Sequence, residues 1–280
     1  MIHVKRVSGH AACSVRTTAS VWQASPIADS RRMQTVAGGD FWKDFRDDMP
    51  LVRIPTANGA ILYDPSRVDH PQPGDFEPAA LAAAGRVQST ANGRGSVWFV
   101  AAPGGGSWVL RHYRRGGWAA RVSADRYLWR GEEATRAFRE LRLLARLESE
   151  GLAAARGVAA RVERAGATYR ADLLTVAVPG VTTLAARLAG GVPAPVWRAL
   201  GATLRTFHDA GVDHADLNAH NVLVDALGRV TLIDFDRGRV RAPGPWRSAN
   251  LARLARSLAK LGARPAGAAW AELMAGYEAR

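Results

Sequence analysis

The stretch HDAGVDHADLNAHN at residues 208–221, followed by IDFD at residues 233–236, decides the fold class of this chain. Asp216 and Asn221 are close enough in sequence to share one short loop, so both side chains can face a single pocket. Asp234 ends a short apolar run of β character, a position where a carboxylate is held rigidly. The sequence therefore predicts that a carboxylate, an amide and a second carboxylate come together at one site.

These residue types suit phosphoryl transfer, which needs a carboxylate near the acceptor hydroxyl and hard oxygen ligands that keep Mg²⁺ on the nucleotide phosphates. The pattern resembles protein kinases and their small-molecule relatives, in which His-x-Asp-x-x-x-x-Asn precedes Asp-Phe-Gly. We predict Asp216 as the catalytic base and Asn221 and Asp234 as the metal ligands. Asp236 replaces the motif's final glycine, which argues against a flip of this segment but not against metal binding by Asp234. An isolated His214-x-Asp216 could simply close a turn, but that alternative leaves the order and spacing of the whole set unexplained.

The bulk composition indicates a globular protein without a multi-cysteine metal site. The chain has 280 residues, 48% of them hydrophobic, which is enough to bury a core. The single cysteine, Cys13, excludes an intramolecular disulfide and any multi-cysteine metal site. Charged residues interrupt every apolar run before the roughly 20 residues that a membrane-spanning helix requires. The net charge of +13 favours polyanionic partners, and arginine supplies almost all of the positive charge.

The order of patterns along the chain predicts an α+β, protein-kinase-like bilobal fold. Residues 1–48 lack sustained periodicity, so we expect a poorly structured leader whose start codon is open to question. Residues 49–178 should form a small, β-rich, nucleotide-binding N-terminal lobe with an extension, and residues 179–280 a helical C-terminal lobe that carries the catalytic loop. In the first lobe we expect a helix over residues 77–84, one main amphipathic helix over residues 132–147, and strands over residues 60–63, 96–100, 107–113, 158–164, 168–170 and 173–178. In the second we expect helices over residues 183–188, 196–210 and 249–261, and short strands over residues 222–224 and 230–233.

The nucleotide-binding residues are predicted from weaker signals in the β-rich half. Gly93, Gly95 and Val100 fit the pattern Gly-x-Gly-x-x-Gly-x-Val of a glycine-rich loop, although Trp98 replaces the third glycine. No lysine occurs between Lys43 and Lys260, so the phosphate-contacting lysine of kinases is missing.

Arg111 occupies the corresponding strand position and can bind phosphate through its guanidinium. Its expected partner is Glu140 on the main helix, and the alternative is that Glu140 forms a solvated pair with a neighbouring arginine. We expect His208 to have a structural role at a helix end and assign none to His220. The arginine-rich segments at residues 111–117 and 121–130 carry interleaved aromatics, which fits either a polyanion-binding surface or ordinary solvated charge.

At the level of a family, the sequence resembles the 3-deoxy-D-manno-octulosonic acid (Kdo) kinases of the lipopolysaccharide kinase group. The resemblance covers roughly residues 60–261 and rests on GRGSVWFV, WVLRHYRRGG, DRYLWRG, TRAFRELRLLARL, YRADLLT and HADLNAHNVLVD followed by LIDFDRGR. It implies a transferase of lipopolysaccharide core biosynthesis that uses ATP and Mg²⁺ to phosphorylate the 4-hydroxyl of Kdo on a lipid A precursor. It also implies a peripheral enzyme on the cytoplasmic side of the bacterial inner membrane, where an anionic surface would attract a basic protein.

The resemblance leaves the anion-binding arginines open among Arg114, Arg115, Arg121, Arg126 and Arg130. Three alternatives also stay open. The first is a kinase of the same fold that acts on heptose or on another small-molecule or protein hydroxyl. The second is a catalytically inactive binding module, which only the missing lysine supports. The third is a nucleic-acid binder, which we do not expect because it leaves the motifs unexplained.

Overall fold

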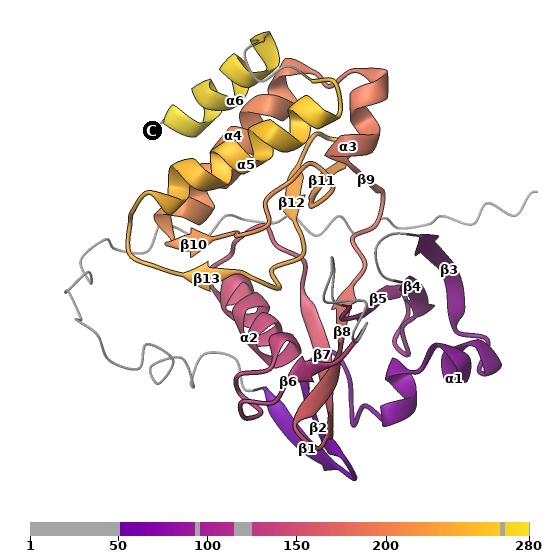
Figure 1. Ribbon diagram of the computed structural model, residues 1–280. Coiled ribbons are helices and arrows are strands. Elements are labelled where there is room, and N and C mark those ends of the chain that lie inside the picture. Colours follow the sequence, from indigo (N-terminus) through magenta and orange to yellow (C-terminus); the bar gives the residue numbers. More distant parts are fainter. Residues whose placement is uncertain (1–50, 93–95, 115–124, 264–266, 280) are drawn as a thin grey trace, which may run out of the picture. The chain divides into compact units, whose positions relative to one another are not determined.

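The computed structural model describes residues 51–92, 96–114, 125–263 and 267–279. All of these residues belong to one compact unit within Lys43–Arg280. The leader predicted for residues 1–48 lies outside the described residues. The described part has the predicted α+β organisation, with strands dominating its first half and helices its second (Figure 1).

An antiparallel sheet of eight strands forms the N-terminal lobe. Its strand order is β1-β2-β7-β8-β5-β4-β3, and the short β6 pairs with β8. The strands are β1 (Val52–Thr56), β2 (Gly59–Tyr63), β3 (Val87–Asn92), β4 (Ser96–Ala101), β5 (Ser107–His112), β6 (Tyr127–Leu128), β7 (Gly157–Ala165) and β8 (Thr168–Val176). The sheet places β5, which carries Arg111, next to β8 near its centre.

The predicted strands over residues 96–100 and 107–113 pair as the β4–β5 hairpin. The N–H of Ala102 donates to the carbonyl of Gly106 at 3.2 Å, and Gly105 and Gly106 have φ angles of +92° and +79°. Glycine adopts such angles without steric penalty, so the Gly-rich run closes the turn.

The predicted separation of residues 168–170 from residues 173–178 is wrong. Both runs belong to the continuous strand β8, and the intervening Asp172 is buried. Its carboxylate accepts hydrogen bonds from the Arg161 guanidinium at 2.8 and 2.9 Å. That pairing makes a charged residue compatible with the middle of the sheet.

The main helix, α2 (Arg136–Ser149), packs against the sheet with the apolar face that its periodicity predicts. Phe138, Leu141 and Leu144 on that face are all buried. The helix begins at Arg136 rather than at Glu132 because Thr135 closes a turn with the carbonyl of Glu132 and occupies the N-cap position. This shorter helix still presents Glu140 toward β5.

The N-terminal extension consists of a 3₁₀ turn, η2 (Pro73–Phe76), and the helix α1 (Pro78–Ala83). Phe76 is buried in a second core cluster on the sheet, and the Arg161 guanidinium donates to the Glu77 carboxylate at 2.5 Å. The extension is therefore part of the lobe.

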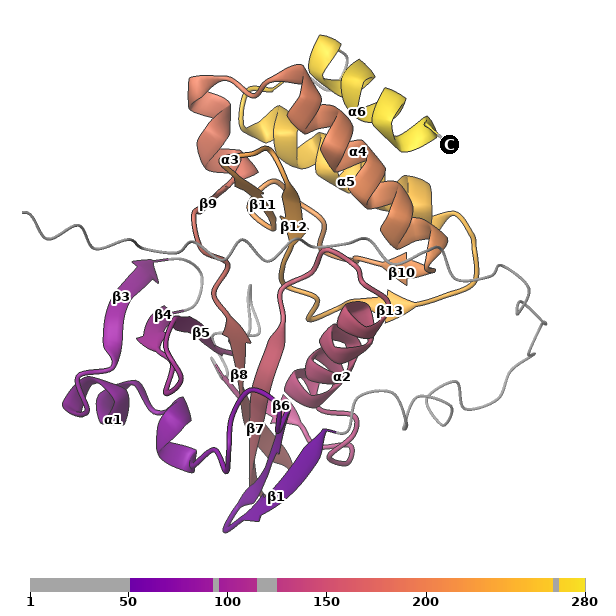
Figure 2. The ribbon, with the colours of Figure 1, turned by 180° about the vertical axis from the view of Figure 1, so that it is seen from behind.

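The C-terminal lobe combines helices with two small sheets, which both views show between the large helices and the N-terminal lobe (Figure 1 and Figure 2). The sheets are β9-β11-β12 and β10-β13. The elements are β9 (Val181–Thr183), α3 (Leu184–Arg187), η4 (Leu188–Gly190), α4 (Ala194–Asp209), β10 (Val212–Asp213), β11 (Val222–Asp225), β12 (Val230–Leu232), β13 (Arg239–Val240), α5 (Trp246–Lys260) and α6 (Ala268–Glu278). Residues 181–183 pair as a strand, so the helix predicted from residue 183 begins one residue later, at Leu184.

Among the described helices, none combines the length and apolarity needed to cross a lipid bilayer.

Candidate active site

The loop between β10 and β11 presents Asp216 to solvent. Leu217 and Ala219, which follow it in the loop, are fully buried and anchor the loop in the core. The N–H of Leu217 donates to the carbonyl of His214 at 3.0 Å, which closes the turn around Asp216. Asp216 itself is exposed, and within the described residues its carboxylate has no hydrogen bond or ion pair. The carboxylate is thus available to an incoming hydroxyl.

Asn221 and Asp234 lie at the same end of the β11–β12 hairpin. The N–H of Ile233 donates to the main-chain carbonyl of Asn221 at 3.0 Å, which extends the pairing of Val222 with Leu232. The Asn221 amide nitrogen donates to the carbonyl of Asp216 at 3.0 Å. The structure therefore brings the predicted base and both predicted metal ligands together, and it ties Asn221 directly to the Asp216 backbone.

Arg111 bridges the predicted metal ligand Asp234 and the helix residue Glu140. One terminal nitrogen of its guanidinium bonds to Asp234 Oδ1 and the other to Glu140 Oε2. Glu140 is 2% exposed, so the alternative of a solvated pair is wrong and the predicted Arg111–Glu140 ion pair is present. A planar guanidinium with two donor edges suits this bridging geometry better than a lysine ammonium would.

Tyr113 completes this network and was not predicted. Its hydroxyl donates to Glu140 Oε2 at 2.5 Å, and Arg111 stacks over its ring at 4.7 Å. The sequence signal that could have found it is its spacing of two residues from Arg111, because alternate residues of an extended segment project from the same face.

Burial dominates the electrostatics of this network. Removal from water raises the pKa of Glu140, and the charge of Arg111 opposes that rise. Burial also lowers the pKa of Arg111, but Glu140, Tyr113 and Asp234 outweigh it and raise the pKa well above its ordinary value. Arg111 therefore stays charged and provides a fixed positive centre beside Asp234.

The backbone of the Asp234 segment is fixed from several sides. Asp234 has a φ angle of +65°, in the left-handed region that an aspartate tolerates better than most residues. The N–H of Phe235 donates to Glu140 Oε1 at 3.0 Å, and the Phe235 ring stacks on Phe207 with centroids 5.8 Å apart. These contacts hold the Asp234 carboxylate in place against α2.

His214 supports the loop from inside. Its Nε2 lies 3.0 Å from the carbonyl of Ile233, and its ring packs on Phe235 with centroids 4.5 Å apart. Burial lowers the pKa of His214, so the ring is neutral and Nε2 donates to that carbonyl. His214 thus positions the chain between Asp216 and Asp234 and does not face the site as a catalyst.

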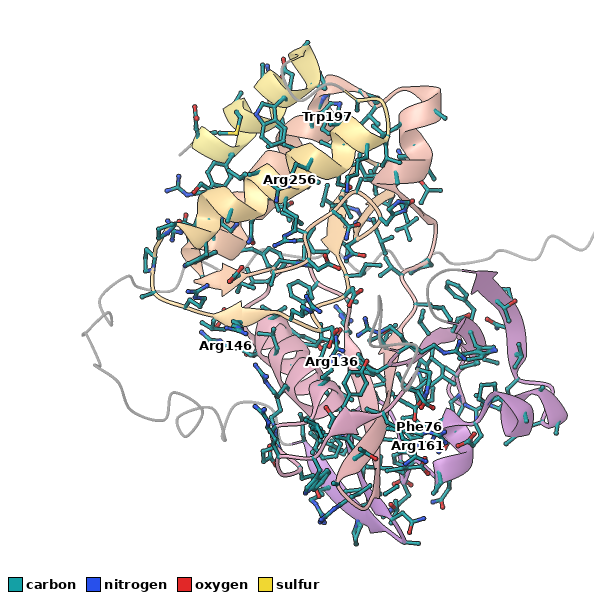
Figure 3. All side chains as sticks on the ribbon, in the orientation of Figure 1. Phe76, Arg136, Arg146, Arg161, Trp197 and Arg256 are labelled. Atoms are coloured by element: carbon teal, nitrogen blue, oxygen red, sulfur yellow. The ribbon has the colours of Figure 1, made fainter. Side chains whose placement is uncertain are left out.

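Asp236, which stands where the kinase motif has glycine, forms a two-point ion pair with Arg136 at the start of α2. The Arg136 Nε donates to Asp236 Oδ1 at 2.6 Å, and its Nη2 bonds to Oδ2. Figure 3 labels Arg136 between the two lobes. The sequence predicts no partner for Asp236, because the pairing of residues 136 and 236 depends on tertiary structure.

The residues present fit a Mg²⁺ ion that is held mainly by a nucleotide. Asn221 commits its amide nitrogen to Asp216, which leaves Oδ1 as an oxygen donor, and Asp234 keeps Oδ2 when Arg111 binds Oδ1. The described part of the chain contains no group of three or more His, Cys, Asp or Glu side chains that could hold a metal alone. Mg²⁺ commonly uses one or two protein oxygens and takes its other ligands from phosphates and water.

Several of the remaining predicted residues fall outside the described part of the chain. Gly93 and Gly95 lie outside the described residues. The flanking residues, Asn92 of β3 and Ser96 of β4, pair with each other in the antiparallel ladder. Arg115 and Arg121, two of the five candidate anion-binding arginines, also lie outside the described residues. The other three, Arg114, Arg126 and Arg130, lie within them.

The two other histidines have different environments. His208 is buried near the end of α4, with Nδ1 2.7 Å from the Tyr277 hydroxyl, which agrees with the structural role predicted for it. His220 is exposed on the loop.

Comparison with known proteins agrees with the kinase-like geometry of the site. The model of the lipopolysaccharide kinase (Kdo/WaaP) family matches residues 79–277. Relatives called 3-deoxy-D-manno-octulosonic acid kinase include one from Stenotrophomonas maltophilia (strain K279a), 49% identical over 205 residues, and one from Xanthomonas campestris pv. campestris (strain B100), 50% identical over 207 residues. Each alignment covers 72% of this chain and 81% of the relative.

Among solved structures, the amicoumacin kinase hAmiN in complex with AMP-PNP, Ca²⁺ and Ami matches with a TM-score of 0.52. The match covers 76% of this chain and 78% of that one at 14% identity, so it supports the fold alone. The family model covers most of the chain, and the relatives share about half of their aligned residues with it. The chain belongs to the lipopolysaccharide kinase (Kdo/WaaP) family.

Proposed function

We propose that this chain is a Kdo kinase, which transfers the γ-phosphoryl group of ATP to a hydroxyl of Kdo on a lipid A precursor. The main support for this proposal is the sequence identity of about 50% with relatives named as Kdo kinases, over 81% of their length. The described site agrees with this activity because Asp216, Asn221, Asp234 and the Arg111–Glu140 pair are all present and adjacent.

In the proposed reaction, the oxygen of the sugar hydroxyl attacks the γ-phosphorus. The bond from that phosphorus to the β–γ bridging oxygen breaks, ADP leaves, and the hydroxyl proton passes to the Asp216 carboxylate. Asp216 is suited to this role because it is exposed and its carboxylate has no bond within the described residues. Glu140 and Asp234 orient Arg111 so that its positive charge lies where the nucleotide phosphates would bind.

Asn221 Oδ1 and the Asp234 carboxylate would hold Mg²⁺, which supplies neutralisation of the phosphate charge when it is bound. The glycine pair Gly93 and Gly95 would contribute backbone N–H groups to the phosphates. We also propose the 4-hydroxyl as the acceptor atom, by resemblance to the family.

We further propose that the enzyme works at the cytoplasmic side of the inner membrane as a peripheral protein. The net charge of +13 supports this, since basic proteins bind anionic lipid surfaces electrostatically. Sedimentation with vesicles that contain anionic lipid should carry the protein down at low salt and release it at high salt. Equal recovery with neutral and anionic vesicles would contradict the membrane contact.

Transfer of labelled phosphate from ATP tests the proposed function. Three acceptors should be compared in the presence of Mg²⁺: a Kdo-bearing lipid A precursor, the same precursor without Kdo, and a heptose-bearing glycolipid. Only the first should become labelled, and mapping of the label should place it on the 4-hydroxyl. Labelling of the heptose acceptor alone would keep the kinase and discard Kdo as the acceptor.

A further inference from the structure

A basic pocket lies next to the catalytic loop, on the side where α2 meets the segment that follows Asp234. It has a volume of about 500 Å³, and Ala215, the neighbour of Asp216, forms part of its wall. Its lining contains six arginines, from three different parts of the chain: Arg136, Arg139, Arg237, Arg239, Arg241 and Arg253.

The two carboxylates in this basic pocket are already paired. Asp236 is bonded by Arg136. Asp213 accepts from the Arg241 guanidinium at 3.0 Å and from the Asn250 amide at 2.8 Å. With six arginines against two aspartates, the pocket keeps a large positive excess.

Three of its arginines have no counter-charge. Arg237, Arg239 and Arg253 are exposed, and within the described residues none of their side chains makes a hydrogen bond or an ion pair. Unpaired guanidiniums that converge on one pocket repel each other, and an oxyanion bound between them would remove that repulsion.

We propose that this basic pocket binds an anionic group of the acceptor, and so places the acceptor hydroxyl beside Asp216. The shared chemistry is an oxyanion, either the carboxylate of the acidic sugar or a phosphate on the lipid part. The proposal rests on the proposed function. It locates acceptor binding at Arg237, Arg239 and Arg253, and not in the arginine-rich segments at residues 111–117 and 121–130 that the sequence had suggested.

The surface beside the basic pocket suits an acceptor that is anionic only in part. A second pocket of about 440 Å³ shares Asp213, Ala215, Arg241 and Arg253 with the first. It adds Pro245, Trp246 and Ala249 from the start of α5 and the turn before it, and thus offers a more apolar wall. An acidic sugar joined to less polar groups would match this change of lining.

Steady-state kinetics on the full chain test the proposal, with Arg237→Gln, Arg239→Gln and Arg253→Gln as single variants. Each should raise KM for the Kdo-bearing lipid A precursor about 10-fold or more, because a charge-assisted hydrogen bond to the acceptor is lost. KM for ATP should stay within about twofold of wild type, since these side chains do not contact the Arg111 network.

Arg256→Gln is the matched control. Arg256 is an exposed arginine on the same helix as Arg253, one turn later, but it does not line the basic pocket, and Figure 3 places it away from Arg136. Its removal lowers the net charge equally, so it should leave KM for the glycolipid unchanged. Equal effects of Arg253→Gln and Arg256→Gln would reduce the proposal to a general charge effect and overturn it.

Acceptors with and without lipid phosphates identify the anion. If the arginine substitutions raise KM only for the acceptor that carries lipid phosphates, the pocket binds phosphate. If they raise KM equally for both acceptors, it binds the sugar carboxylate. Either result supports an oxyanion site.

Equilibrium binding of the same glycolipid without ATP separates this proposal from the proposed function. Weaker binding to the three variants than to wild type supports the basic pocket even if no phosphate is transferred to Kdo. Transfer by wild type together with unchanged binding and unchanged KM in all three variants would keep the kinase and overturn the pocket.

Discussion

At the scale of single residues, Arg111 is the position where this chain departs most from the kinase pattern. In the structure, its one guanidinium reaches both Glu140 and Asp234. We expect Arg111→Lys to raise KM for ATP about 10-fold, because a single ammonium cannot reproduce both directed bonds. Steady-state kinetics over a range of ATP concentrations measure this, with Arg256→Lys as the control. A variant with unchanged KM would show that charge alone suffices.

His208 gives a prediction on pH. Burial is the main cause that lowers its pKa from 6.5 to about 4, with the charge of Arg247 acting in the same direction. In the unfolded chain the His208 ring is protonated below about pH 6.5. In the folded chain it is protonated only below about pH 4. The free energy of unfolding should therefore fall as pH drops through this window. Denaturant titrations from pH 7 to pH 4 should show a weaker fall in His208→Gln than in wild type.

The exposed His220 is the control for this experiment. His220→Gln should keep the pH dependence of wild type, because that ring stays in solvent in the folded chain. An unchanged slope in His208→Gln would instead assign the acid sensitivity to other groups, such as the buried carboxylates.

The sequence allowed the main residues of the candidate site to be predicted, because kinase-like spacing is local in the chain. Asp216, Asn221 and Asp234 come together on one loop and one hairpin, as expected from short separations. Tyr113 and Arg136 were missed because their roles depend on contacts across the fold, with Glu140 and with Asp236.

At the scale of elements, α2 is held to the C-terminal lobe at two points. Glu140 accepts the Phe235 N–H, and Arg136 pairs with Asp236. We expect Arg136→Ala and Asp236→Ala each to destabilise the fold, and the double variant to lose less than the sum. Denaturant unfolding of the four proteins should give a coupling of about 1–2 kcal/mol.

Arg142→Ala is the control for that cycle. The pair of Arg142 with Glu133 lies on the exposed side of α2, so its loss should change stability by no more than about 0.5 kcal/mol. Additive effects in the Arg136–Asp236 cycle would mean that the ion pair does not couple the helix to the segment.

Helices α4 and α6 approach closely through two glycines. A Cβ on Gly201 would lie 1.9 Å from the Leu273 carbonyl oxygen, and one on Gly276 would lie 2.1 Å from that of Arg198. Gly201→Ala should therefore lower the free energy of unfolding by about 1–3 kcal/mol, although alanine is the better helix former. Thermal unfolding measures this.

Gly190 provides the comparison for Gly201, since a Cβ there would meet nothing within 4 Å. Gly190→Ala should be neutral or slightly stabilising. If both substitutions behave alike, the close approach of α4 and α6 does not limit stability.

Three of the elements that were not predicted, β1, β3 and α6, share a weak local pattern. Strands β1 and β3 are the two edges of the large sheet, and β1 contains Pro55, which an edge strand tolerates. Helix α6 is rich in small residues, because its packing on α4 depends on close approach rather than on a wide apolar stripe. Each of these elements is stabilised by tertiary partners, so the local sequence carries little trace of it.

At the scale of the whole molecule, the α+β, kinase-like fold class followed from the sequence. The basic pocket did not, because its arginines come from residues 136–139, 237–241 and 253 and meet only in the folded chain. The net charge of +13 indicated an anionic partner but gave no location for it.

The most direct test of the account is a single-turnover measurement of phosphate transfer from ATP to the Kdo-bearing lipid A precursor, with Asp216→Asn compared with wild type. Asparagine keeps the size of the side chain but cannot accept the proton. We expect wild type to label the glycolipid and Asp216→Asn to be slower by roughly 10²- to 10⁴-fold with similar binding of ATP. Equal rates for the two proteins would contradict the assignment of Asp216 as the base.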